Sequence, residues 1–521
     1  MNVAQTERPY RAIVLDAICV ILLVAYFLYF ALPALHGGFR EDEMMNISIY
    51  WRVGALKSLL TNLTFWTTFY RPGGALYYLP LYHFFDLDPQ PYRIAQISIL
   101  AASIPIVYYL SRCLASSRTV AFLAVLVLCY HPRLEELVFV GSFIYDVLCG
   151  FFYFAALTYY RHIREKGLRL YPVKLLAFLA LYICSLNSKE MAVTLPVIVL
   201  IYELLKRPLW PDWKAFCRWS WSVAGPSVIA GLLTAVYIYG KTRGNTSLMR
   251  YDSYRPKFSW HHFVISNAQF VGELLCAPQA ITPTALLGLW AVVLIYALLR
   301  RDRMVQLMAL WVVIVPLPIA FLVPIRGGGS LYLVLFGWAM IFARAVSDLI
   351  TLASKCWIFI RQSAGWRAVT GGVAENVPAR RLGTASPDAA RVNASSRRFR
   401  VLATAFVAFI LAIFTRSENQ RLGWVPAVLN QGQKISHVIA ALKSLNLQPA
   451  PGSTVLLRAK ENPFPNRWDA LFIASLVWND RSLRIWLEGA HKLTPGQIAK
   501  MNYIISLSEF EAQIIRSPEV R

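Results

Sequence analysis

The sequence predicts an α-helical polytopic membrane protein with a small α/β domain at its C-terminal end. The chain of 521 residues is 57% hydrophobic and only 15% charged, which leaves too little polar surface for a soluble protein of this length. Apolar runs of about 15–24 residues, long enough to cross a bilayer as helices, recur as far as residue 415. Beyond that point the chain is less apolar, and strand-like segments alternate with helix-like ones.

Length and apolarity predict about eleven membrane-spanning helices. The first apolar run is too long for the core of a signal peptide, and no small-residue cleavage site follows it. The expected spans are 12–35, 93–114, 119–131, 137–160, 173–188, 191–205, 220–239, 281–299, 304–324, 330–352 and 401–415.

The net charge of +24 lies mostly in alternate short loops between these spans. This pattern follows the positive-inside rule, so we expect a cytoplasmic N-terminus and a cytoplasmic linker over residues 353–400. Membrane lipids with anionic headgroups, and no nucleic acid, are the expected partners of the basic loops. The short loops favour a bacterial inner membrane. The eight cysteines show no metal-ligand spacing.

We divide the chain into a transmembrane domain, residues 1–415, and an extracytoplasmic α/β domain, residues 416–521. Two long external loops, 36–92 and 240–280, interrupt the first domain, and an interfacial helix is expected over residues 44–62. In the second domain we expect strands at Thr454–Leu457, Leu483–Leu487 and Tyr503–Leu507 and helices at 433–445, 467–478 and 495–501.

Three consecutive carboxylates, Glu41, Asp42 and Glu43, follow the first span. Acids at a membrane boundary are costly, so they need water, partners or a function. A carboxylate whose pKa is raised by burial and a like charge could act as a general base, which makes Asp42 and Glu43 the candidate catalytic residues. The alternative is a solvated acidic turn that caps the helix after Met44. A divalent cation, Mg²⁺ or Mn²⁺, could bind the pair, but the sequence requires none.

Two more charged groups lie on the same predicted side. Glu136 precedes Asp146, a lone carboxylate at the start of an apolar helix, which should face a cavity or a partner. An ion pair with Arg133 or an interfacial position would also explain Asp146. Lys189 interrupts two apolar runs and could bind a phosphate, or could simply neutralise the adjacent Glu190.

The external loop 240–262 mixes cations with aromatic residues, among them Tyr254 and His262. Aromatic faces suit sugars and arginines suit phosphates, although an interfacial aromatic belt has the same composition. Arg326 precedes three glycines whose N–H groups could bind an anion, or which form a flexible loop. The sequence contains no P-loop, GxSxG, zinc or dinucleotide motif.

Four motifs, in this order, resemble the GT-C superfamily of glycosyltransferases that use polyprenyl-phosphate-linked sugars. They are most similar to the branch of protein O-mannosyltransferases and TPR-bearing transmembrane O-mannosyltransferases. The resemblance covers residues 12–205, with Phe143 and Ile144 where the family often has Gly-Arg and no TPR repeats after the membrane part. The motifs are Phe39-x-x-Asp42-Glu43, Tyr70-Arg71-Pro72, His131-Pro132 with Glu136 and Asp146, and Ser188-Lys189-Glu190 continuing to Pro196.

The resemblance implies an inverting transfer of a sugar from a polyprenyl phosphate, such as dolichyl or undecaprenyl phosphate, to a glycan, lipid or protein acceptor. Asp42 would be the base or the carboxylate that orients the acceptor, and Arg71 with Lys189 would contact phosphate. Glu43, Glu136 and Asp146 would shape the site. A transporter or flippase of a lipid-linked sugar is the alternative, but it should show paired repeat halves, which we do not find. A catalytically silent scaffold is a third option.

Overall fold

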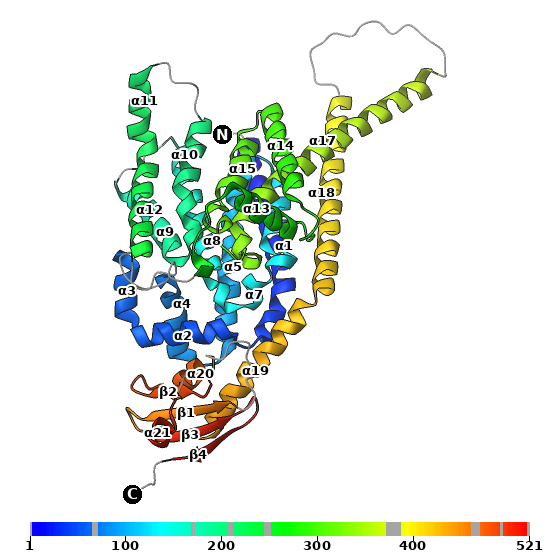
Figure 1. Cartoon of the computed structure of the whole chain (residues 1–521). Helices are drawn as coiled ribbons and strands as arrows, with labels where there is room; N and C mark the ends of the chain where they lie inside the picture. The colour runs from blue at the N-terminus through cyan, green and yellow to red at the C-terminus, as the bar shows by residue number, and fades with distance from the viewer. Residues whose placement is uncertain are drawn as a thin grey trace.

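The computed structural model describes residues 3–64, 71–167, 170, 172–206, 212–243, 252–370, 387–459, 469–489 and 493–517. These residues form a bundle of long helices with a small sheet domain at one end (Figure 1). Helix α1 begins at the opposite end of the bundle from the sheet domain.

The helices of the membrane part differ widely in length. They are α1 (Val3–Ala31), α2 (Glu41–Val53), α3 (Ala55–Thr64), α4 (Ala75–Phe85), α5 (Pro89–Ala115), α6 (Arg118–Cys129), α7 (Glu136–Phe139), α8 (Ile144–Glu165), α9 (Pro172–Ser188), α10 (Leu195–Lys206), α11 (Trp213–Trp219), α12 (Gly225–Arg243), α13 (Trp260–Leu274), α14 (Pro283–Arg300), α15 (Arg303–Ile314), α16 (Leu317–Ala320), α17 (Tyr332–Thr370) and α18 (Pro387–Leu422).

Each of the eleven predicted spans is helical along most of its length. Within the described residues, seven helical segments are long and apolar enough to cross a membrane, which agrees with an integral membrane protein. They are Ala12–His36, Pro89–Ala115, Gly141–Glu165, Pro283–Arg300, Arg303–Ala320, Gly328–Phe359 and Ser395–Leu422. Helices α6 and α9 are apolar but shorter. The count of eleven therefore stays a prediction.

The predicted linker 353–400 differs from the structure. Helix α17 continues to Thr370 and α18 begins at Pro387, so the ends of the linker are helical, and residues 371–386 lie outside the described part. The two helices pack together there: Ser354 and Ser396 share a hydrogen bond of 2.9 Å, and the Trp357 ring stacks on Phe399. We predicted a linker because this tract is rich in polar and small residues. Its alanines and arginines are also strong helix formers, and they extend the two helices into it.

The first external loop contains two helices where the sequence predicted one over residues 44–62. Gly54, with φ of 84°, ends α2 because this backbone conformation suits glycine far better than other residues. Helix α2 is not simply interfacial, since Met44, Ile47 and Tyr50 are buried in the core. In the second long loop, the sequence analysis missed α13, which begins where the Ser259 hydroxyl accepts a bond from the His262 N–H.

The C-terminal domain contains the four-stranded sheet β2-β1-β3-β4. Strand β1 pairs in parallel with β2 and β3, whereas β4 is antiparallel to β3. The three predicted strands and three predicted helices are confirmed, and β4 was missed. The elements are α19 (Trp424–Ser444), β1 (Thr454–Ala459), α20 (Asp469–Val477), β2 (Arg484–Leu487), α21 (Pro495–Ala499), β3 (Tyr503–Leu507) and β4 (Ala512–Arg516).

This domain packs against the first external loop. The Tyr82 hydroxyl donates to the Leu476 carbonyl (2.9 Å), and Arg52 of α2 donates to the Ser475 hydroxyl of α20 (3.0 Å). The Arg481 guanidinium lies over the Trp51 ring, 5.3 Å from its centre. Helix α20 therefore supports the helix that carries Asp42.

Candidate functional site

Glu43 forms a buried ion pair at the start of α2. Its two carboxylate oxygens accept bonds of 2.8 and 2.9 Å from Arg93, and one also accepts from the Arg40 backbone N–H (2.6 Å). Glu43 and Arg93 are 1% and 0% exposed. A Cβ at Gly141 would overlap the Glu43 carboxylate, so this loop must approach without a side chain. Glu43 thus fixes α2 to α5.

Asp42 is adjacent in sequence but lies in a different environment. Its residue is exposed, and its position in the first turn of α2 is favoured by the helix dipole, as the capping alternative expects. The same helix, α2, carries Tyr50, which connects it to α8 and to the Arg71 turn. Tyr145 shares a 3.0 Å hydrogen bond with Tyr50, which donates to the Arg71 carbonyl (2.6 Å). The helix that begins with Asp42 therefore contacts, through Tyr50, a corner that contains Arg71.

Lys189 and Asp146 form the second buried pair. The Lys189 ammonium donates to the Asp146 carboxylate and, at 3.1 Å, to the Ser330 hydroxyl. Both charged residues are 6% exposed. Asp146 is therefore paired with Lys189 instead of Arg133, whose guanidinium lies 3.9 Å from Glu273.

Glu190 pairs with Arg71 at 3.2 Å, so it does not simply neutralise Lys189. Burial favours the neutral carboxyl, but Arg71, Lys241 and Lys189 outweigh this effect and lower the pKa of Glu190 to about 2. The Arg71 backbone is left-handed (φ 53°), and the next residues form the short 3₁₀ helix Pro72–Gly74. A Cβ at Gly73 would crowd the Asn187 carbonyl at 3.0 Å, so this turn lies directly on the end of α9.

The glycine segment after Arg326 binds an anion, but the anion is the protein's own carboxylate. Glu136 accepts a 3.2 Å bond from the Gly329 N–H, and a Cβ at Gly328 would overlap it. Burial, with the nearby Asp146, raises the pKa of Glu136 against the effects of Gly329, Arg40 and Lys189. Glu136 therefore holds the glycine segment in place through Gly329, and the next residue, Ser330, accepts the bond from Lys189.

Tyr254 contacts Arg326 on a neighbouring surface, and His262 contacts the chain segment that leads to Arg326. The Arg326 guanidinium lies 4.7 Å from the centre of the Tyr254 ring, a cation–π contact. The His262 ring nitrogen Nε2 is 3.0 Å from the Leu322 carbonyl. Arg326 is four residues before Ser330, so this surface adjoins the Lys189 pair through one chain segment.

An apolar groove of about 340 Å³ adjoins this corner. Gly73, in the turn that follows Arg71, and Ser188, which precedes Lys189, line this groove. The other lining residues are Leu76, Tyr77, Pro80, Leu81, Ala95, Ile99, Leu148, Phe152 and Cys184, from α4, α5, α8 and α9. A charged corner thus meets a groove that suits a long hydrocarbon chain.

Several residues of the site were not singled out from the sequence. Arg93 had a usable signal, because an arginine at the edge of an apolar span requires a partner. Tyr50, Tyr145 and Ser330 had none, since aromatic and hydroxyl residues are common in membrane helices and loops.

A bound cation is neither supported nor tested by the described residues. In that part of the chain, no group of three or more His, Cys, Asp or Glu side chains could hold a metal ion. An ion shared by Asp42 and Glu43 would compete with Arg93 for the Glu43 oxygens. The Mg²⁺ or Mn²⁺ site stays a prediction.

The fold is that of an integral membrane protein of the GT-C fold class, as predicted. The chain resembles the solved structure of ArnT from Cupriavidus metallidurans bound to undecaprenyl phosphate, with a TM-score of 0.51 and 14% identity over 92% of this chain and 88% of that one. The apo structure of the same protein aligns with a TM-score of 0.46 and 13% identity, over 92% and 86% of the two chains. No family model and no curated protein matches the sequence. The O-mannosyltransferase branch stays a prediction.

Proposed function

We propose that this protein is a membrane glycosyltransferase that moves a sugar from a polyprenyl phosphate to an extracytoplasmic acceptor. The observation that carries the proposal is that two paired cations, Arg71 and Lys189, adjoin an apolar groove, while the helix of the exposed acid Asp42 contacts the Arg71 carbonyl through Tyr50. The likeness to ArnT, whose structure contains undecaprenyl phosphate, supports a lipid-linked donor.

The cations would hold the donor phosphate. Arg71 and Lys189 are each oriented by a carboxylate, which fixes their position in a poorly solvated site. A phosphate at this corner would receive charge-assisted bonds that strengthen as negative charge develops on the leaving oxygen. The polyprenyl chain would lie in the groove that begins at Gly73 and Ser188, where burial of its methylenes favours binding.

Asp42 would accept the proton of the acceptor hydroxyl. Both Glu43 oxygens already accept bonds from Arg93, so Glu43 contributes to catalysis by fixing α2. One displacement by the activated hydroxyl inverts the anomeric centre. Glu136, Asp146 and Glu190 would shape the site, and Tyr254, His262 and Arg326 would line an outer part of the substrate path.

The location follows from the same proposal. We place the protein in a bacterial inner membrane with its N-terminus in the cytoplasm. The corner and the C-terminal domain lie at the same end of the bundle, away from the start of α1, which supports an extracytoplasmic position for both (Figure 1). The acceptor is a glycan, a lipid or a protein.

The test compares Asp42→Asn with Asp86→Asn, which removes an exposed acid from the same external loop. Mass spectrometry of glycans and lipids should find that cells with Asp42→Asn match a deletion strain, whereas Asp86→Asn matches wild type. Both variants should keep wild-type membrane levels. Normal products from Asp42→Asn would disprove the assignment of the base. Vesicles that move the lipid-linked sugar across the bilayer without forming a glycosidic bond would favour a flippase.

A further inference from the structure

The connector 37–40 joins the end of the first span to α2, in which Asp42 is the second residue. The Arg93 guanidinium donates to the Gly38 carbonyl at 2.6 Å, and it also donates to both Glu43 carboxylate oxygens. This arginine is fully buried. One side chain of α5 therefore holds the connector and the first turn of α2 together.

Helix α19 of the C-terminal domain contacts the same connector, backbone against backbone. A Cβ on Gly38 would lie 2.2 Å from the Gly432 carbonyl oxygen, and a Cβ on Gly432 would lie 2.7 Å from the Gly38 nitrogen. No residue with a side chain fits at either position unless the backbone shifts. One turn earlier, Leu429 packs on Gly37, where a Cβ would be 3.5 Å from the Leu429 Cδ2. The C-terminal domain thus touches the chain four residues before Asp42.

Gly432 lies in the middle of α19, where alanine would be more favourable for the helix. It is buried on the helix face that carries Val428, Ile435 and Ile439. The close contact with Gly38 explains why a glycine stands among these larger residues. The same helix packs against α20 and β4, so the contact links the connector to the sheet domain (Figure 1).

We propose that the C-terminal domain positions the catalytic acid. The backbone of α19 at Gly432 and the Arg93 side chain together hold the connector, and so they set the place of Asp42 relative to Arg71 and Lys189. The inference rests on the proposed sugar transfer. Gly432 is a positioning residue, because it contacts the connector and acts on the reaction through α2. The donor contacts lie on other elements, so a shift of the connector should slow transfer without weakening donor binding.

Gly432→Ala tests this role in the full chain. The added methyl group must displace the connector, and a misplacement of about 1 Å should lower the transfer rate per folded protein by roughly ten- to hundredfold. Rates are measured in native membranes, which supply the lipid-linked sugar and the acceptor. Binding of undecaprenyl phosphate should stay at the wild-type level. Hydrogen exchange over residues 38–50 should increase.

Gly496→Ala is the matched control within the C-terminal domain. Gly496 belongs to α21, and a Cβ there would meet no atom within 4 Å. The transfer rate, the binding of undecaprenyl phosphate and the exchange of α2 should all be unchanged.

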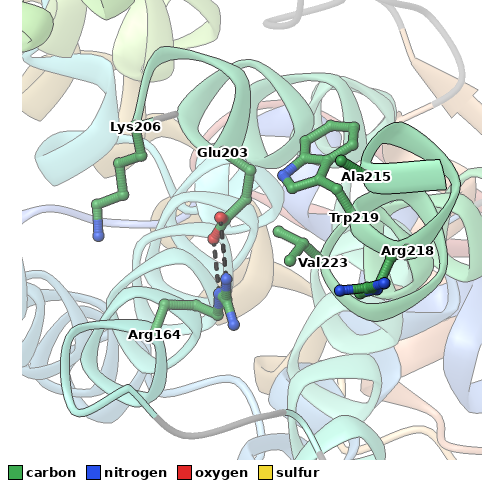
Figure 2. A pocket seen from close by; sticks show the side chains of 7 residues that line it. All are labelled: Arg164, Glu203, Lys206, Ala215, Arg218, Trp219 and Val223. Carbon is green, nitrogen blue, oxygen red and sulfur yellow. Dashed lines mark hydrogen bonds and ion pairs between the residues drawn. The ribbon is translucent and has the colours of Figure 1, made fainter. Parts of the chain in front are cut away.

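A second control removes packing far from the connector. Val223→Ala enlarges a cavity of about 380 Å³, which Figure 2 shows together with the Arg164–Glu203 pair. Arg164 is eighteen residues from Asp146 along α8, roughly 27 Å, so this cavity is at the other end of that helix. The variant should lower thermal stability but leave the rate per folded protein and the exchange of α2 unchanged.

The outcomes separate positioning from folding and from the proposed function. If Gly432→Ala does not reach the membrane, Leu429→Ala removes the packing on Gly37 without overlap and should lower the rate by a smaller factor. A wild-type rate or wild-type exchange of α2 in the folded variant would overturn the proposal, as would a loss of undecaprenyl phosphate binding. If the wild type transfers no sugar, the proposed function fails, while the exchange of α2 still shows whether α19 holds the connector.

Discussion

The two ends of helix α8 carry charged clusters of different design. Near its start, each cation of the corner is paired with its own acid, Lys189 with Asp146 and Arg71 with Glu190. At its other end, one such pair, Arg164 with Glu203, is surrounded by additional positive charge. Paired cations are held in a defined geometry, which chemistry requires.

The same contrast separates two adjacent acids. Glu43 is buried, and both of its carboxylate oxygens accept hydrogen bonds from Arg93, whereas Asp42 is exposed. A helix places consecutive residues on different faces, so one acid can anchor the helix while the next meets a substrate.

The largest loss of stability should follow from breaking the buried pair of Arg93 with Glu43, which fixes α2 to α5. Arg93→Ala leaves the Glu43 charge buried, which should cost about 3–5 kcal/mol of unfolding free energy. Arg164→Ala should cost less, because Lys206 and Tyr160 remain near Glu203. Thermal unfolding of both variants in detergent measures the difference, and equal losses would contradict the contrast between the two ends.

The next effect is catalytic. Lys189→Met should lower the transfer rate per folded protein by about 10²-fold, because a charge-assisted bond to the leaving phosphate is lost. It also leaves the Asp146 charge buried without its partner, so the folded fraction is measured alongside. Arg300→Ala, which removes an exposed partner of Asp348 far from the corner, is the matched control. Rates are measured with each variant in vesicles that contain the lipid-linked donor. A change in substrate affinity alone would show that Lys189 binds the donor without stabilising charge in the reaction.

Two acids near the corner should respond oppositely to pH. Burial, with Glu136 beside it, raises the pKa of Glu135 to about 8, and its Oε2 has no hydrogen-bond partner in the described structure. The folded protein then binds a proton that the unfolded chain releases above its pKa of about 4.5, so stability falls as pH rises from 4.5 to 8, by at most about 1.4 kcal/mol per unit. Glu135→Gln should flatten this slope in unfolding experiments between pH 5 and 8.

Glu190 should make the stability depend on pH in the opposite direction. Its pKa of about 2 means that its contribution to stability is complete above pH 4.5 and is lost as pH falls toward 2. Glu190→Gln should therefore destabilise the protein at pH 7 more than at pH 3. A stability difference independent of pH would show that the Arg71 pair is not the cause.

The smallest effect concerns the C-terminal domain. Arg52→Ala removes the 3.0 Å bond to Ser475 and should cost about 1 kcal/mol. Hydrogen exchange should then increase in α2, the helix of Asp42. Lys443→Ala breaks an exposed pair with Asp86 and should leave exchange in α2 unchanged. Increased exchange in both variants would show that α20 does not support α2 through Arg52.

Hydropathy was enough to predict most of the helical ranges and the small α/β domain, and motif order predicted that the acids gather at one end of the bundle. These properties depend on the residues of each segment alone, so the sequence of that segment is enough to predict them. Gly54 predicts the end of a helix and Ser259 predicts the start of one. Both signals are local, but we expected one continuous helix at the first position and a loop at the second.

The pairing of charges could not be deduced in the same way. Asp146 had Arg133 near it in sequence and Lys189 had Glu190, yet each finds a different partner once α8, α9 and the glycine segment meet. Arg93 joins Glu43 across fifty residues. Ion pairs depend on distances of a few ångströms between side chains from separate helices, and only the packing of the bundle sets those distances.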